Sequence, residues 1–203
     1  MSVRETIRIE DIPQTLYHDS IASDSLLVLF PGMGYTCEKP LLYYARTKAE
    51  DMSMDVLCID YGIEGFDKAR IEESLHPVKE LSYQAVKEVL RHSDYKHIYF
   101  ISKSIGTIAA GYTRERLKRD IPQFYLTPLP QTIPYMTHSD DIAISGTSDP
   151  MMPLEGLKQL KQSGIHVRIV EGADHSLQIL NDTDKSVAIL VDVLKLYDDF
   201  LKR

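Results

Sequence analysis

The stretch "FISKSIGTIAAG" (residues 100–111) is typical of a β-strand that runs directly into an α-helix. Its first residues are mostly apolar, and its last residues are small and suit a helix. Ser104 stands at the bend between the two elements, and Gly106 follows two positions later. Small residues let a strand and a helix approach closely at such a bend, and they leave the side chain at the bend free. The stretch therefore predicts a β–α unit with a hydroxyl at its turn.

Similar units recur on both sides of this stretch. We expect strands at 25–32, 55–62, 96–104, 123–128, 141–150 and 165–175, and helices at 39–52, 67–92, 105–119, 153–164 and 186–203. Continuous apolar runs are typical of strands buried on both faces, and helices of this length between them indicate parallel crossovers. The weaker segments 5–12 and 15–20 are expected to form an antiparallel edge. The predicted fold is an α/β, doubly wound, mostly parallel sheet flanked by helices.

Length and charge limit the classes of protein that this chain can belong to. It has 203 residues, a size at which a domain buries about 70% of its unfolded surface. No repeat, linker or low-complexity tract interrupts it, so we expect a single domain over residues 1–203. The net charge of −7 argues against the clustered basic surface that a nucleic-acid partner requires.

The chain also lacks signals for export, membranes and metals. Its first residues are charged and have no apolar core of a secretory signal, and no apolar run approaches the roughly 20 residues of a membrane span. The two cysteines, Cys37 and Cys58, are too few for a disulfide scaffold and lack metal-site spacing. We expect a cytoplasmic protein with no membrane partner, no metal and no organic cofactor. The sequence leaves the oligomeric state open.

Chemically useful side chains follow several of the predicted strands, at the carboxyl ends where functional groups gather in parallel sheets. Ser104 follows one strand, Asp149 lies in "GTSDP" after another, and His175 lies in "GADHS" after the last. A histidine beside a serine acts as general base, and a carboxylate behind it holds the imidazole in the useful tautomer. The backbone N–H groups of Met33 and Ile105 are the expected oxyanion donors, each worth about 2.7–4 kcal/mol in the barrier.

Four segments resemble loops of the α/β-hydrolase superfamily, in the order of that superfamily and over nearly the whole chain. They are the oxyanion loop "LFPGMG" (29–34), the nucleophile elbow "SKSIG" (102–106), the acid loop "GTSDPMMP" (146–153) and the histidine loop "GADHS" (172–176). Two positions depart from the usual motifs: Ser102 replaces the first elbow glycine, and Pro31 replaces a common histidine. The resemblance implies a serine hydrolase with a Ser104–His175–Asp149 triad.

The short connection at 129–140 stands where many members of that superfamily insert a helical lid. We therefore expect a small hydrolase without a cap domain, cleaving a small ester or thioester through an acyl-enzyme intermediate. Side chains that flank the expected triad either line a substrate pocket or pack in the core; they are Tyr35, Met151, Met152 and Leu177. Residues of the short connection that would overhang the pocket are Tyr135, Met136 and His138.

Other functions are compatible with the same residues. Ser104 and Asp149 are also common turn residues, and a non-catalytic binding or scaffold protein is the alternative that the changes at Ser102 and Pro31 favour. Acyl transfer or peptide hydrolysis by the same triad is a further alternative, because the choice of acceptor depends on the shape of the pocket.

Three neighbouring side chains also have open roles. Asp174 competes with Asp149 as the acid, although side chains of adjacent residues usually point apart. Cys37 lies near the expected oxyanion loop and offers a thiol, but no histidine accompanies it in the sequence. Lys103, next to Ser104, either tunes the site or simply reaches solvent.

Overall fold

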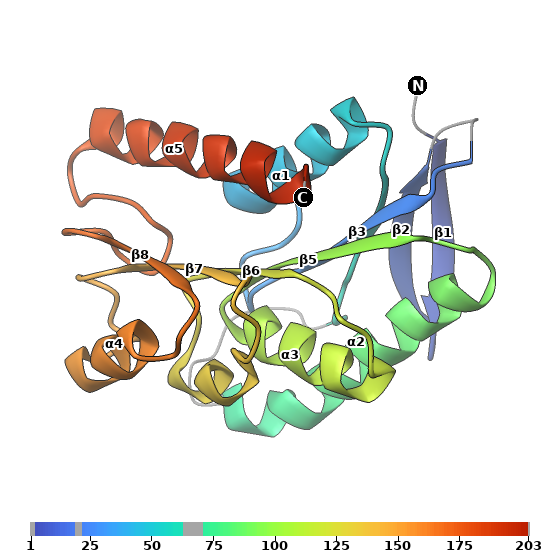
Figure 1. Ribbon diagram of the computed structural model, residues 1–203, viewed down its shortest axis with the longest axis horizontal. Helices are drawn as coiled ribbons and strands as arrows, with labels where there is room; N and C mark the ends of the chain where they lie inside the picture. The colour runs from blue at the N-terminus through green and yellow to red at the C-terminus, as the bar shows by residue number, and fades with distance from the viewer. Residues whose placement is uncertain (1–2, 19–21, 63–70, 203) are drawn as a thin grey trace.

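A computed structural model describes residues 3–18, 22–62 and 71–202 (Figure 1). One eight-stranded sheet runs through it in the order β1-β2-β4-β3-β5-β6-β7-β8. Its strands are β1 (Val3–Ile9), β2 (Ile12–His18), β3 (Ser25–Phe30), β4 (Asp55–Cys58), β5 (His97–Lys103), β6 (Gln123–Leu126), β7 (Ile142–Gly146) and β8 (His166–Val170). β2 pairs antiparallel with both β1 and β4, and the remaining neighbours pair parallel. The predicted mostly parallel sheet and its antiparallel edge are both confirmed.

Helices cover both faces of the sheet, as predicted for a doubly wound fold (Figure 1). α1 (Pro40–Asp51) and α5 (Thr183–Leu201) lie side by side on one face. The other face carries α2 (Ile71–Arg91), α3 (Ile105–Leu117) and α4 (Leu154–Lys161). Residues 67–70, at the start of the second predicted helix, lie outside the described residues.

The last helix starts earlier than the apolar pattern alone indicates. It begins at Thr183, before the predicted start at residue 186, because the side chain of Asp182 accepts a hydrogen bond from the Lys185 N–H at 3.0 Å. A carboxylate at this position satisfies one of the N–H groups that a helix start leaves unpaired. The apolar periodicity marks the buried stripe of a helix, whereas the polar cap sets where it begins.

The central strand β3 shows why its sequence is apolar without interruption. Leu26, Val28 and Phe30 pack into the cluster beneath α2 and α3, whereas Leu27 and Leu29 pack into the cluster beneath α1 and α5. All five residues have no exposed surface. Successive side chains of a strand point to opposite faces, so a strand covered by helices on both sides needs apolar residues at every position.

The parallel strands β3, β5, β6, β7 and β8 end at the same edge of the sheet, and their following loops meet there. The connection from β6 to β7 lies within the described residues and contains one short 3-10 helix, η2 (Pro130–Tyr135). This connection therefore holds no lid over the sheet edge. Among the described helices, none is both long and apolar enough to cross a bilayer.

Candidate active site

Ser104 occupies the sharp turn between β5 and α3, with φ 55° and ψ −123°. A positive φ is uncommon for a residue other than glycine, and a strained backbone of this kind costs about 1–3 kcal/mol. Two backbone hydrogen bonds support the turn: the Ser104 N–H donates to the Leu126 carbonyl at 3.1 Å, and the Ser104 carbonyl accepts from the Thr107 N–H at 3.0 Å. Such a strained strand-to-helix turn is the geometry of a nucleophile elbow.

The two small residues of the elbow have different reasons to be small. A Cβ atom at Gly106 would lie 2.3 Å from the Pro31 carbonyl oxygen and 2.4 Å from that of Phe30. Both are backbone atoms, so only glycine lets α3 begin against the end of β3. Ser102, in contrast, fits where the superfamily motif has glycine: it is fully buried and donates its hydroxyl to the Phe124 carbonyl at 3.3 Å.

Three loops bring Ser104, His175 and Asp149 into one chain of hydrogen bonds. His175 Nε2 lies 2.8 Å from Ser104 Oγ, and His175 Nδ1 lies 2.7 Å from Asp149 Oδ2. The second Asp149 oxygen accepts from the Met151 N–H at 2.8 Å, and the Asp149 side chain is fully buried. With a proton on Nδ1 facing the carboxylate, Nε2 is free to accept the serine proton. The side chains that the sequence singled out thus lie together.

The loop after β3 lies against Ser104. Gly32 and Tyr35 exchange two backbone hydrogen bonds, of 2.9 and 3.1 Å, which close a tight turn. A Cβ atom at Gly32 would lie only 3.1 Å from Ser104 Cβ. Within the described ranges, the N–H groups of Met33 and Ile105 donate no hydrogen bond to the protein. Both predicted oxyanion donors are therefore available to a bound ligand.

Cys37 and Asp174, the two alternatives left open by the sequence, have other roles. Cys37 is buried, and a hydrogen bond with Cys58 together with burial raises the pKa of its thiol well above the ordinary value. The thiol therefore stays protonated and makes a poor nucleophile. Asp174 Oδ1 accepts from the N–H groups of Ser176 and Gln178, at 2.7 and 2.9 Å. It shapes the turn that carries the histidine instead of orienting the imidazole.

A cavity of about 170 Å³ lies between the loop after β3, the histidine loop and the first turns of α5. Tyr35 and Leu177 line it together with Leu41, Val187 and Leu190, and no charged side chain contributes to its wall. Two of the four predicted pocket residues thus share one cavity beside the histidine loop.

The other two predicted pocket residues pack against apolar clusters of the core. Met152 is 1% exposed and lies in the core with Tyr125, Leu157 and Leu160, where it supports α4. Met151 is half-buried and packs against the apolar cluster beneath α2 and α3. The sequence marks all four as apolar neighbours of the triad, but only the packing of α4 decides which of them turn inward.

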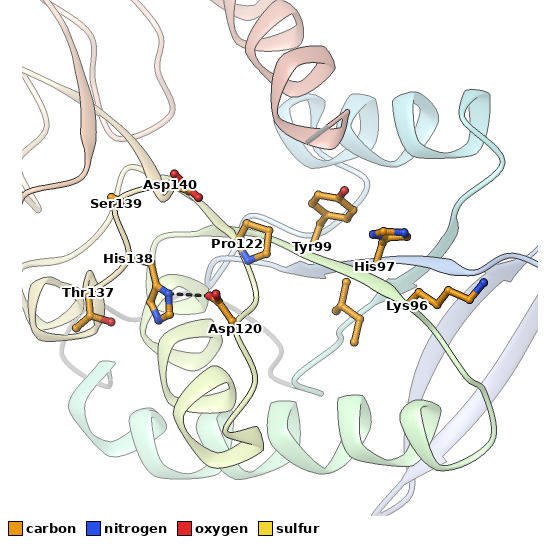
Figure 2. A pocket seen from close by; sticks show the side chains of 10 residues that line it. Lys96, His97, Tyr99, Asp120, Pro122, Thr137, His138, Ser139 and Asp140 are labelled. Atoms are coloured by element: carbon orange, nitrogen blue, oxygen red, sulfur yellow. Dashed lines mark ion pairs between the residues drawn. The ribbon is translucent and has the colours of Figure 1, made fainter.

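The prediction that the short connection overhangs the site is wrong. His138 pairs with Asp120 at 2.7 Å and lines a cavity of about 510 Å³ at the amino ends of the strands, together with Lys96 and His97 (Figure 2). This is the edge of the sheet opposite Ser104. Tyr135 packs against Gly111 of α3, and Met136 is buried. The connection leaves the carboxyl edge at η2 and returns to the far edge, where β7 must begin.

Thr127 is a polar residue at the site that sequence reasoning did not select. It follows β6 directly, has φ 40°, and donates its hydroxyl to the His175 carbonyl at 3.0 Å. Its place at the carboxyl end of a predicted strand is a signal in the sequence, because functional groups gather at these ends in parallel sheets.

Comparisons with solved structures agree with this architecture. An α/β serine hydrolase without a lid from Xanthomonas campestris superposes with a TM-score of 0.71 at 11% identity, covering 100% of this chain and 94% of that one. Est1E from Butyrivibrio proteoclasticus superposes with a TM-score of 0.71 at 11% identity, covering 98% of this chain and 99% of that one. A dienelactone hydrolase from Anabaena variabilis superposes with a TM-score of 0.67 at 12% identity, covering 99% of this chain and 98% of that one. No protein-family model and no curated protein matches the sequence.

The chain therefore has the α/β-hydrolase fold. More narrowly, it has the small form of that fold, in which β6 connects to β7 without a lid. At identities this low the likeness establishes the fold alone, because one fold hosts many unrelated functions.

Proposed function

We propose that this protein is a serine hydrolase that cleaves a small ester or thioester through an acyl-enzyme intermediate. The observation that carries the proposal is the pair of hydrogen bonds, 2.7 and 2.8 Å long, that joins Asp149 to His175 and His175 to Ser104. A serine hydroxyl alone is a weak nucleophile, and an imidazole at this distance is placed to take its proton. The fold that this chain shares with known hydrolases supports the same reaction class.

The reaction begins when Ser104 Oγ attacks the substrate carbonyl carbon and its proton passes to His175 Nε2. Asp149 stabilises the resulting imidazolium. The N–H groups of Met33 and Ile105 donate to the oxyanion of the tetrahedral intermediate. Collapse of the intermediate expels the alcohol or thiol, which takes the proton from Nε2. A water molecule, deprotonated by His175, then attacks the acyl-enzyme by the same route and releases the acid.

The uncharged cavity beside the histidine loop supports a small substrate with an apolar part. Its volume of about 170 Å³ is close to that of an apolar cavity of about 150 Å³ that holds one benzene molecule. It would take a short acyl chain or one aromatic ring as part of an ester. Long acyl chains would extend beyond it, and no lid from the β6–β7 connection would cover them.

The alternatives have less support. A binding or scaffold protein needs neither a base nor a residue that orients the base. Here, however, Asp149 is hydrogen-bonded to His175, and His175 is hydrogen-bonded to Ser104. Acyl transfer and peptide hydrolysis use the same triad and differ only in the acceptor or the leaving group, and the uncharged cavity favours neither. Ester or thioester hydrolysis requires the fewest additional groups.

A fluorophosphonate probe tests the nucleophile, because it phosphonylates only an activated serine. We expect one label per wild-type chain, located at Ser104 by peptide mass spectrometry, and none in Ser104→Ala. Asp149→Asn keeps the shape of the site but disturbs the imidazole tautomer, and its turnover of a short p-nitrophenyl ester should fall about 10⁴-fold. Ser139→Ala, an exposed serine at the opposite edge of the sheet, is the control and should label normally. Labelling that persists in Ser104→Ala would refute the assignment.

A further inference from the structure

Lys103, the residue before the proposed nucleophile, is buried instead of reaching solvent. It is 1% exposed, and its side chain is among the largest that the core encloses completely. No carboxylate of the described residues forms an ion pair with it. A lysine amine in such a place is costly to desolvate, so its contacts must explain its presence.

Those contacts join three loops of the site at one nitrogen atom. Lys103 Nζ donates to Thr127 Oγ1 at 2.5 Å and to the His175 carbonyl oxygen at 2.7 Å. The Thr127 hydroxyl donates to the same carbonyl at 3.0 Å. Nζ also lies 5.1 Å from the centre of the Tyr35 ring, and Tyr35 is hydrogen-bonded to Gly32 in the loop against Ser104.

The bond to the His175 carbonyl matters because it holds the backbone of the histidine itself, whereas the other bonds of the loop hold the imidazole or neighbouring residues. Asp174 holds the following turn through Ser176 and Gln178, but none of these bonds reaches the backbone of His175 itself. The carbonyl of His175 is held only by Lys103 and Thr127 among the described residues. Lys103 is the last residue of β5, and Thr127 directly follows the adjacent strand β6. These two residues therefore bind the histidine backbone to the edge of the sheet.

We propose that Lys103 is a positioning residue, which clamps the backbone of His175 so that Nε2 stays within reach of Ser104 Oγ. This inference rests on the proposed function for its kinetic consequence, although the clamp itself is a property of the free protein. The lysine acts through the histidine and does not touch the substrate.

The clamp needs the two N–H bonds of the amine and not its charge. Burial lowers the pKa of Lys103 to about 7, while the negative charges of Asp149 and Asp174 raise it and limit that shift. A neutral amine still carries two N–H groups, enough for Thr127 and the His175 carbonyl. The charged form is also accommodated, because the centre of the Tyr35 ring lies 5.1 Å from Nζ and an aromatic ring attracts a cation at this distance. The clamp should therefore persist on both sides of the lysine's titration.

The test compares Lys103→Met, which keeps the length but loses the donors, with Lys103→Gln, which retains a neutral donor. We expect kcat for a short p-nitrophenyl ester to fall about 10–100-fold in Lys103→Met, with KM changed less than about threefold, because a misplacement of about 1 Å costs rate on this scale. Lys103→Gln should recover part of the loss. The exposed Lys158→Met is the control and should match the wild type.

A proton NMR readout separates positioning from a merely structural role. The Nδ1 proton that His175 shares with Asp149 should give a low-field signal in the wild type and in Lys158→Met, and it should broaden or vanish in a folded Lys103→Met. If Lys103→Met does not fold, Thr127→Val removes the second bond to the same carbonyl and should weaken the signal and kcat in the same direction. Wild-type kcat and an unchanged signal in folded Lys103→Met or in Thr127→Val would overturn the inference.

The experiment also distinguishes this inference from the proposed function. If the wild type turns over no ester and takes no fluorophosphonate label, the proposed function fails, while the NMR comparison still decides the clamp. If the wild type is active and folded Lys103→Met is equally active, the clamp fails alone. A wild-type kcat that fell as the pH rose through about 7 and lost that fall in Lys103→Met would show that the charge acts, against the clamp as stated.

Discussion

At the elbow, one strained residue depends on close contacts made by its neighbours. Ser104 has a positive φ. Gly106, two positions later, has no side chain, so the carbonyl oxygens of Pro31 and Phe30 can lie close to its Cα atom. Strain of this kind persists only where the surrounding structure determines it from several sides. The position of the hydroxyl is thus a consequence of packing between α3 and the end of β3.

Gly106→Ala should destabilise the fold. Its new methyl group would collide with two backbone oxygens, and overpacking of this kind costs about 1–3 kcal/mol or more. Urea unfolding measures the loss, and fluorophosphonate labelling should slow in parallel because Ser104 moves with the helix start. The control is Gly156→Ala in α4, where the nearest atom is the flexible sulfur of Met152. Helix propensity favours that alanine by about 1 kcal/mol, so equal losses in the two variants would contradict the packing explanation.

At the scale of elements, α3 is fixed at both ends. Its start carries the elbow, and near its other end Arg114 reaches Asp141, just before β7. Nη1 lies 2.9 Å from each Asp141 oxygen, and Nη2 donates to the Tyr135 carbonyl at 2.5 Å. Asp141 also accepts from the Gln123 N–H at 3.0 Å. This buried network of hydrogen bonds joins α3, η2, β6 and β7.

Arg114→Met should cost about 3–5 kcal/mol, because it leaves the buried carboxylate of Asp141 without its cation. Denaturant unfolding followed by circular dichroism gives the free energy. The comparison is Arg168→Met, which breaks an ion pair with Asp192 of similar length, 2.9 Å, but with both side chains nearly half exposed. That loss should stay below about 1 kcal/mol. A cost for Arg114→Met as small as the surface value would mean that Asp141 is not held by this pair.

At the scale of the whole molecule, the core is sensitive to alkaline conditions. Burial raises the pKa of Tyr61, Tyr125 and Tyr197 well above the ordinary value of about 10. Their folded-state pKa exceeds the unfolded value, so the stability they contribute is complete below about pH 10 and is lost as the pH rises above it. The pKa of Lys103 is lowered instead, so this residue makes the free energy of unfolding rise as the pH increases from about 7 to about 10.

The free energy of unfolding should therefore fall steeply above about pH 10, by up to about 1.4 kcal/mol per pH unit for each buried tyrosine. Urea unfolding at a series of pH values measures the slope, and tyrosinate absorbance identifies the groups that ionise. Tyr197→Phe removes one of them, together with its hydrogen bond to the Leu41 carbonyl, and should make the slope shallower. Tyr43→Phe, at an exposed position, should leave it unchanged. Identical slopes in all three proteins would contradict this account.

Local patterns in the sequence were sufficient for the fold class and for the three side chains that lie together at the candidate site, Ser104, Asp149 and His175. The uninterrupted apolar run of β3 indicates a strand covered on both faces, and the segment around Ser104 shows a strand-to-helix bend and resembles a superfamily motif. Because parallel strands place their carboxyl ends at one edge, the loops of Asp149 and His175 were expected beside it. Boundaries were less accurate, since the predicted strands at 55–62, 141–150 and 165–175 included the loop residues that follow them.

Only the tertiary structure decided which way individual side chains turn. Lys103 is buried because its amine meets Thr127 and His175, which lie 24 and 72 residues further along the chain. His138 faces the opposite edge because its segment must return to the start of β7, and Met152 is buried because α4 folds over it. The periodicity of apolar residues and the residue preferences of turns depend on near neighbours, so they can be recognised in the sequence. Burial and side-chain pairing depend on contacts between distant segments, which exist only once the sheet has assembled.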